Sequence, residues 1–190
     1  MASFVERAIG AARLDAATYE EVEADPGSLG QAMAIVVLAA ISAGIGNSLA
    51  SGGHGPSLVV AVLFNLAAWF VWAFITYLVG TRILPTAETQ ADVGQLLRTT
   101  GFSATPGVLG ILGGVPLIGA LVLFVAWLWQ LAAMVVAVRQ ALDYTSTGRA
   151  IGVCLIGFAA YLLVAIVLAG AVMGALMAVG GLPARAGAMP

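Results

Sequence analysis

The sequence of 190 residues contains no lysine, one cysteine and one histidine. Because there is no second cysteine, no disulfide can form within the chain, and Cys154 lies in an apolar run without metal-ligand spacing around it. His54 lies in a glycine-rich segment without acidic or cysteine neighbours that would make it a metal ligand or a general base. The sequence therefore predicts a non-enzymatic protein with no catalytic residue, no metal ligand and no cofactor, and nucleic acid is not an expected partner.

Charge is also scarce, since only 8% of the residues are charged and 62% are hydrophobic. Soluble domains typically carry about 25% charged residues. The long apolar runs follow an acidic N-terminal segment, which does not fit the basic start of a signal peptide. These features predict one all-α membrane domain, a polytopic transmembrane helical bundle, with no second domain.

Polar breaks divide the apolar sequence into five predicted spans, most of about 20 residues, which is enough to cross roughly 30 Å of hydrocarbon. Residues 1–27 form a predicted cytoplasmic segment with an amphipathic helix followed by an acidic one, and residues 181–190 a tail on the other side. The piece at 101–112 is short, and a re-entrant hairpin is the alternative to a crossing. Within the membrane domain at 28–180, the predicted spans are 28–49, 58–80, 101–112, 117–138 and 150–179.

Six of the seven arginines fall on one side of this predicted topology. Short loops that carry arginine stay in the cytoplasm. The pattern predicts a protein of the cell membrane with its N-terminus inside and its C-terminus outside. The six are Arg7, Arg13, Arg82, Arg98, Arg139 and Arg149, and Arg185 in the tail is the exception.

Polar and aromatic side chains recur at helical spacing in the middle of two predicted spans. Asn and Gln in hydrocarbon seek partners on neighbouring helices, so these faces either hold helices together or line a lipid or ligand pocket. No ionisable group lies in the middle of a span, which argues against ion- or proton-coupled transport. The pocket candidates are Asn65, Trp69, Trp72 and Thr76 on the second span and Gln130, beside Trp127 and Met134, on the fourth.

Two further groups of residues are candidates for contacts. Small residues at every fourth position allow helices to approach closely, either within the chain or in a homo-oligomer. Charged residues at the cytoplasmic face either meet lipid phosphates and water or form a docking surface for a basic protein partner. The small residues are Ala40, Gly44, Ser48, Gly170, Gly174 and Ala178, and the docking candidates are Glu20, Glu21, Glu23, Asp25, Arg98, Arg139 and Asp143.

Several segments resemble the bacterial branch of the Yip family, polytopic membrane proteins named for their interaction with Ypt/Rab GTPases. The resemblance covers roughly residues 4–169 and implies five spans with a cytoplasmic N-terminus. Residues 25–27 read DPG, where the eukaryotic branch has Asp-Leu-Tyr-Gly-Pro, so Rab binding is not implied. The segments are 18–26 (TYEEVEADP), 65–72 (NLAAWFVW), 97–109 (LRTTGFSATPGVL), 129–131 (WQL) and 137–142 (AVRQAL).

Together these features predict an integral membrane protein of the Yip type that organises membrane or scaffolds partner proteins through its cytoplasmic face. Its expected partners are membrane lipids and a membrane or cytoplasmic protein. The alternative is a transporter or permease component, or a lipid-handling protein, that uses the polar-aromatic faces of the second and fourth spans.

Overall fold

The computed structural model describes residues 2–54 and 57–180, and in this part helices are joined by loops and turns, with no strand. The predicted tail at 181–190 lies outside the described residues. The α-helices are α1 (Phe4–Ala12), α2 (Ala16–Ala24), α3 (Leu29–Ala50), α4 (Leu58–Leu78), α5 (Val93–Phe102), α6 (Gly119–Ala141) and α7 (Thr147–Gly180). Short 3₁₀ and π elements connect or extend them, namely η1 (Pro26–Ser28), η2 (Val79–Ile83) and η3 (Thr105–Gly114).

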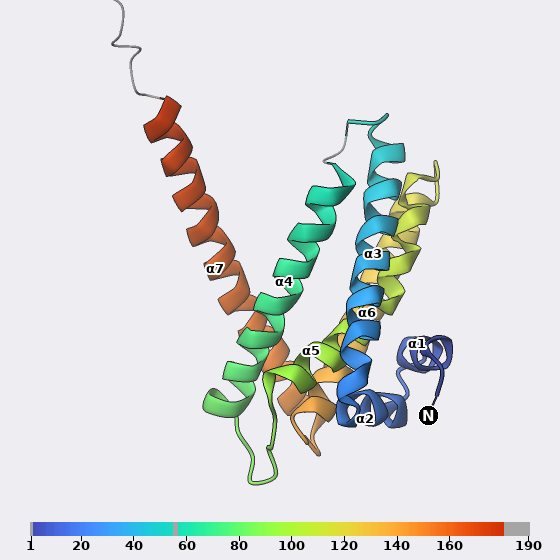
Figure 1. Cartoon of the computed structure of the whole chain (residues 1–190), viewed down its shortest axis with the longest axis vertical. Coiled ribbons are helices and arrows are strands. Elements are labelled where there is room, and N and C mark those ends of the chain that lie inside the picture. The colour runs from blue at the N-terminus through green and yellow to red at the C-terminus, as the bar shows by residue number, and fades with distance from the viewer. Residues whose placement is uncertain (1, 55–56, 181–190) are drawn as a thin grey trace, which may run out of the picture.

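Four stretches of the described chain are helical, long and apolar enough to cross a membrane. Three of them run roughly along the longest axis of the molecule, and the fourth, in α7, leans away from the others (Figure 1). The predicted all-α, membrane-spanning class is confirmed, whereas the fifth crossing and the orientation stay predictions. The four stretches are Pro26–Ala50, Leu58–Ile83, Gly119–Ala141 and Thr147–Ala175.

The predicted span at 101–112 is divided between two elements. Its first two residues end α5, and most of the rest forms η3. A 3₁₀ helix rises about 2.0 Å per residue, so η3 alone is about 20 Å long, shorter than a bilayer core. Pro106 lacks a backbone N–H, and the glycines of η3 let it pack closely against α3: a Cβ on Gly110 would lie 2.9 Å from the Cα of Ala43. The segment is therefore a short helical element that packs closely beside α3 and α6.

One end of the bundle, which we call the charged end, carries α1, α2, the loop at 84–92 and the turn between α6 and α7 (Figure 1). Every arginine and every carboxylate of the described residues lies in these elements or in the segments that adjoin them, namely η2, α5, the last turn of α6 and the first turn of α7. Both α1 and α2 lie across the long helices rather than along them (Figure 1). The hydrophobic core also lies nearer this end, with Tyr19, Leu96, Phe102 and Leu142 fully buried.

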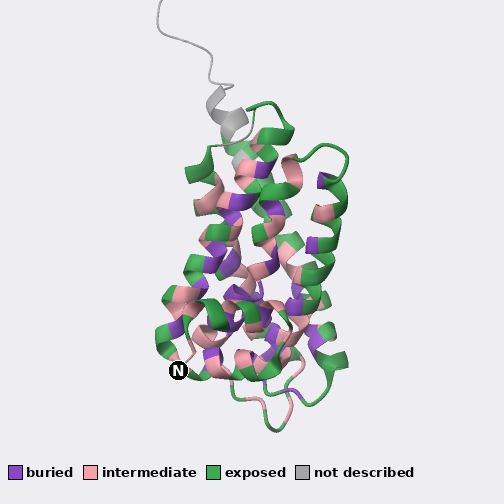
Figure 2. Cartoon of the chain, turned by 90° about the vertical axis from the view of Figure 1, so that its right-hand side faces the viewer, coloured by how far each residue is buried: buried purple, intermediate pink, exposed green. Residues whose placement is uncertain are grey.

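The opposite part of the bundle, which we call the apolar half, is open. α7 diverges from α4 beyond its first turns (Figure 1), and exposed residues dominate there (Figure 2). Large apolar side chains such as Phe64, Leu121 and Leu163 are more than half exposed. Such a surface suits contact with lipid tails, which are as apolar as these side chains.

Candidate functional site

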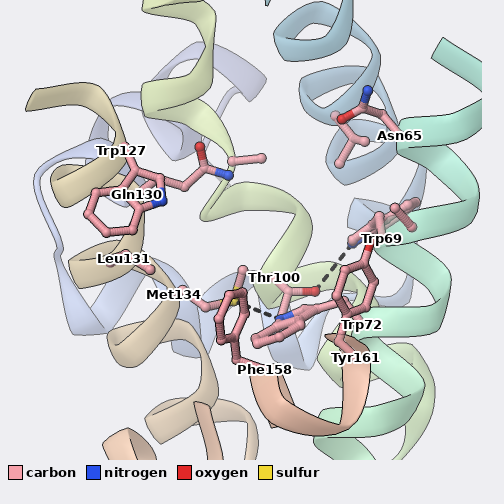
Figure 3. Close-up of a pocket in the computed structure, with 13 residues that line it drawn as sticks. Asn65, Trp69, Trp72, Thr100, Trp127, Gln130, Leu131, Met134, Phe158 and Tyr161 are labelled. Carbon is pink, nitrogen blue, oxygen red and sulfur yellow. Dashed lines mark hydrogen bonds between the residues drawn. The ribbon is translucent and has the colours of Figure 1, made fainter. Parts of the chain in front are cut away.

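The polar and aromatic faces predicted on two separate spans meet in one cleft of about 320 Å³ (Figure 3). A volume near 300 Å³ is at the small end of the range for ligand pockets. The cleft contains no charged side chain in its lining. Its lining residues are Val36 on α3, Asn65, Ala68, Trp69 and Trp72 on α4, Thr100 on α5, Ala104 between α5 and η3, Trp127, Gln130, Leu131 and Met134 on α6, and Phe158 and Tyr161 on α7.

The floor of the cleft is fixed by hydrogen bonds. The Trp69 indole, only 7% exposed, donates from Nε1 to Oγ1 of Thr100 at 3.2 Å, and that hydroxyl donates to the Leu96 carbonyl. The Trp72 indole donates from Nε1 to Sδ of Met134 at 3.1 Å. Both indole N–H groups, one buried and one half-buried, therefore have hydrogen-bond partners. Gly101 makes the fit possible, because a Cβ there would lie 3.1 Å from the Trp69 ring.

The rim of the cleft differs from its floor. Asn65 donates from Nδ2 to the Ala61 carbonyl at 2.9 Å, which leaves its amide oxygen unused. Among the described residues, neither the Gln130 amide nor the Tyr161 hydroxyl makes a hydrogen bond with the protein. Asn65 and Gln130 lie on opposite walls and point into the space between α4 and α6 (Figure 3). The rim thus presents polar groups that the chain itself does not satisfy.

Thr76, a pocket candidate from the sequence, does not line the cleft. Its side chain is fully buried, and its hydroxyl donates to the Trp72 and Ala73 carbonyls of its own helix at 2.9 and 3.0 Å. Conversely, the sequence did not single out Thr100, Phe158 or Tyr161. Phe158 and Tyr161 are three residues apart on a span whose neighbouring residues are small or aliphatic, and this spacing was a usable signal.

At the charged end, the docking candidate Arg98 is used within the chain. It is 8% exposed and donates from Nε to the carbonyls of Val22 and Glu23 at 3.1 and 3.0 Å. Its Nη2 also donates to the Glu23 carbonyl. These carbonyls belong to the last turn of α2, where helix carbonyls lack partners and the helix dipole favours a cation. Arg98 therefore caps α2 and holds it against α5.

Arg7, which the sequence analysis treated only as a topological marker, organises the N-terminal helices. Its side chain is 2% exposed, and its guanidinium contacts Oε1 of Glu21 at 2.9 Å and Oδ2 of Asp25 at 2.8 Å. It also donates to Oε1 of Gln31 on α3 at 3.2 Å. The Arg7 charge lowers the pKa of both Glu21 and Asp25 through these hydrogen bonds. Two docking candidates thus serve a contact between α1, α2 and α3.

The three remaining exposed or half-buried docking candidates, Glu20, Arg139 and Asp143, line one surface hollow of about 290 Å³. Arg139 turns back on its own loop and donates to the Tyr144 carbonyl at 3.1 Å. Glu20 accepts from the Gln140 amide across the α2–α6 contact. Asp143 has φ of +51°, a left-handed conformation that aspartate tolerates better than most residues. The hollow is therefore bordered by two carboxylates, while its arginine is engaged by the backbone.

Glu23 is the unusual carboxylate of this end. It is 7% exposed, and its Oε2 is buried without a hydrogen-bond partner among the described residues. Burial, together with the nearby carboxylates of Asp143 and Glu20, raises its pKa to about 7. Arg98 acts in the opposite direction, although it donates to the Glu23 carbonyl rather than to the carboxylate. Glu23 is thus a structural carboxyl beneath the surface rather than a docking group.

The small-residue stripes have different surroundings. On α3, Ala40 is buried, Ser48 is half-buried, and a Cβ on Gly44 would lie 2.6 Å from Cδ2 of Leu58. On α7, a Cβ on Gly170 or Gly174 would meet nothing within 4 Å. The side chain of Ala178 lies outside the described residues. Of the two stripes, the one on α3 packs within the chain.

The closest glycine contact was not predicted from the sequence. A Cβ on Gly46 of α3 would lie 2.0 Å from the carbonyl oxygen of Gly110 on η3. The signal was present, because Gly44 and Gly46 alternate on the first span and η3 is rich in glycine. Without the three-dimensional pairing, however, nothing distinguished Gly46 from Gly44.

Comparisons with known proteins give one match. A family model described as the Yip1 domain matches residues 15–182, which is most of the chain. No curated protein and no solved structure matches the chain significantly. The match begins at the N-cap of α2, so α1 precedes it.

Proposed function

The chain belongs to the Yip1 domain family, and from that premise we propose that this integral membrane protein scaffolds a protein partner through its charged end. We place that end in the cytoplasm and the bundle in the cell membrane. The role is non-enzymatic: binding at the charged end organises partners, and the helices hold the site in the membrane. The observation that carries the proposal is the hollow formed by Glu20, Arg139 and Asp143.

The distribution of arginine supports this orientation. The segments that carry six arginines, which include η2, α5, the last turn of α6 and the first turn of α7, lie together at one end of the bundle (Figure 1), and loops that carry arginine stay in the cytoplasm. The carboxylates share that end and do not oppose the rule, because acidic residues contribute little to it. In the described loops of the apolar half, the only ionisable side chain is that of His54.

The chemistry of the hollow favours a basic segment of a partner. Glu20 and Asp143 supply two carboxylates, which each accept one hydrogen bond, from the Gln140 amide and the Gln90 backbone N–H, and the Arg139 guanidinium is held by the carbonyls of Tyr144 and Thr145. Complementary charge steers the encounter of two proteins and fixes their register. A lysine- or arginine-bearing segment would therefore meet an acidic recess whose own cation is already engaged.

The absence of lysine makes this proposal directly testable. A zero-length cross-linker that joins carboxylates to amines cannot link two side chains of this protein. Applied to native membranes, it should join Glu20 or Asp143 to a lysine of a partner, identified by mass spectrometry. Glu20→Arg and Asp143→Arg should each reduce recovery of that partner at least tenfold. Glu88→Arg, an exposed charge reversal in the loop at 84–92, is the matched control.

Recovery that is the same in all four proteins would contradict docking at the hollow. Loss of the partner in the Glu88→Arg control as well would show that the association depends on net charge alone, which also contradicts a specific site.

A second candidate function is the handling of a lipid or a neutral solute. The specific observation in its favour is the convergence of Asn65 and Gln130 on one cleft, with polar groups that the chain leaves unsatisfied. This candidate uses a different part of the molecule from the docking hollow, so the two functions can be tested separately.

A further inference from the structure

We infer that the cleft binds one uncharged lipid whose headgroup carries a free hydroxyl, of the diacylglycerol class. The inference rests on the second candidate function and specifies its ligand. It is carried by the charge, the unsatisfied polar groups, the depth and the size of the cleft.

The lining of the cleft excludes a charged ligand. Its lining contains no Asp, Glu, His, Lys or Arg side chain, and the charged residues of the described chain lie at the charged end. An anion moved into an apolar environment without a counter-charge is strongly destabilised. A phosphate or a free carboxylate therefore has no partner there, and an uncharged headgroup does.

The rim supplies hydrogen bonds of both kinds. Gln130 offers an amide donor and acceptor, Asn65 offers its free amide oxygen, and Tyr161 offers a hydroxyl. Polar groups without partners are costly inside a bilayer, where no water replaces them. A hydroxyl donates to one amide and accepts from the other, and an ester carbonyl accepts from Tyr161. A glycerol carrying one hydroxyl and two esters matches this set.

Depth separates such a lipid from the phospholipids around it. Gln130 lies 11 residues from each end of α6 (130 − 119 and 141 − 130). At 1.5 Å per residue it is therefore about 16 Å from either end, close to the middle of a bilayer core. A phosphate headgroup does not leave the interface for that depth, whereas a small uncharged headgroup can.

The size and the mouth of the cleft fit an amphiphile rather than a compact metabolite. About 320 Å³ encloses a headgroup and the first part of its chains. Trp127 and Phe158 at the rim are 56% and 54% exposed, in contrast to Trp69 on the floor. The cleft is lined by residues of both α4 and α7, and α7 diverges from α4 (Figure 1), so the chains can continue into the surrounding hydrocarbon.

The test uses the full chain purified in mild detergent and 1,2-dioctanoylglycerol as the probe. Three of the four tryptophans line the cleft, so their fluorescence reports occupancy. Two lipids with the same chains serve as comparisons, the 3-acetyl ester, which lacks the hydroxyl, and the phosphatidic acid, which is charged. We expect saturable binding of dioctanoylglycerol and at least tenfold weaker binding of each comparison lipid.

Asn65→Leu and Gln130→Leu should each weaken binding of dioctanoylglycerol roughly tenfold, the scale of one lost hydrogen bond. Asn47→Leu is the matched control, because it removes an exposed amide on α3 outside the cleft and should leave affinity unchanged. Melting temperatures without lipid, equal to that of the wild type, establish that the variants are folded. Because leucine suits an apolar span, both variants are expected to pass this check.

Equal binding of the three lipids would mean that the cleft takes acyl chains without reading the headgroup, and the inference would be wrong. Absence of saturable binding, or binding unaffected by both leucine variants, would overturn it as well. Partner cross-linking through Glu20 and Asp143 is measured independently. Failure of the lipid inference is therefore distinguishable from failure of the scaffold function.

Discussion

The two ends of this bundle are held together by different forces. At the charged end, arginines tie segments that are far apart in the sequence: Arg98 of α5 to α2, and Arg7 of α1 to α2 and α3. In the apolar half, α7 exposes the described side chains at 162–171, and Gly170 has no neighbour within 4 Å of a built Cβ. We call the contacts of Arg7 and Arg98 that join the helices at the charged end the polar lock. In the apolar half, the helices have room between them.

The difference follows from the solvent at each end. Lipid tails are as apolar as the helix surfaces, so there is no hydrophobic force that closes the apolar half. Helices approach there only where small residues permit contact, as Gly46 and Gly110 do between α3 and η3. At the charged end, helix termini and carboxylates need partners, and buried hydrogen bonds supply them. The lock thus fixes the helices at one end, while a cleft stays open beyond it.

Breaking the lock should have the largest effect. Arg98→Met removes the cap of α2 and leaves the carbonyls of Val22 and Glu23 without their donor. Loss of a buried, hydrogen-bonded charge costs about 3 kcal/mol or more. We expect a comparable fall in the free energy of unfolding in detergent and rapid hydrogen exchange in α2. Arg82→Met, an exposed arginine at the same end, should change stability by less than about 0.5 kcal/mol. Equal effects of the two substitutions would contradict the lock.

Glycine contacts allow a direct comparison between the two regions. Gly46→Ala places a Cβ 2.0 Å from the carbonyl oxygen of Gly110, so α3 and η3 must separate. Overpacking of this kind typically costs about 1–3 kcal/mol. Gly170→Ala makes no such contact and removes a flexible residue from a helix, so it should be neutral or slightly stabilising. Thermal unfolding of both variants measures the contrast, and a destabilising Gly170→Ala would mean that α7 packs closely there.

Features that depend on composition and spacing could be predicted from the sequence. Features that depend on which residues meet in three dimensions were missed. Hydropathy located four long helices, and the spacing of Asn65, Trp69, Trp72 and Gln130 placed them on faces that meet in one cleft. Thr76 shares the helical spacing of these residues, yet it turns to its own backbone carbonyls. Periodicity assigns a residue to one side of a helix, but it does not say which neighbour occupies that side.

The roles of the charged residues were the hardest to predict. Charge alone made Glu21, Asp25 and Arg98 look like a docking surface, whereas the structure pairs them within the chain. Their partners lie up to 76 residues away in sequence, and no local pattern encodes that separation. Only Glu20, Arg139 and Asp143 converge on a surface hollow. A charged residue on the surface and one that caps a helix inside the protein look identical in the sequence, and only the tertiary contact distinguishes them.

The smallest predicted effect concerns the titration of Glu23, which lies at the charged end beside the contacts of Arg98. The pKa of Glu23 is raised from 4.5 to about 7, because the carboxyl is buried and repelled by the carboxylates of Asp143, Glu20 and Asp92, whereas Arg98 acts in the opposite direction. A carboxyl whose pKa is raised by folding favours the fold while it is protonated, so this contribution falls as pH rises through 7. Proton linkage gives a loss of about 1 kcal/mol between pH 6 and 8.

Protection of α2 from hydrogen exchange, corrected for the intrinsic rate, should therefore decrease over that interval. Glu23→Gln keeps the shape of the side chain and removes its titration, so its protection should not change between pH 6 and 8. Glu88→Gln, in the exposed loop, should retain the wild-type dependence. A wild-type protein whose α2 is equally protected at both pH values would mean that Glu23 is ionised in the fold. Arg98 would then neutralise that carboxylate as well as cap the helix, and the lock would contain no pH-sensitive point.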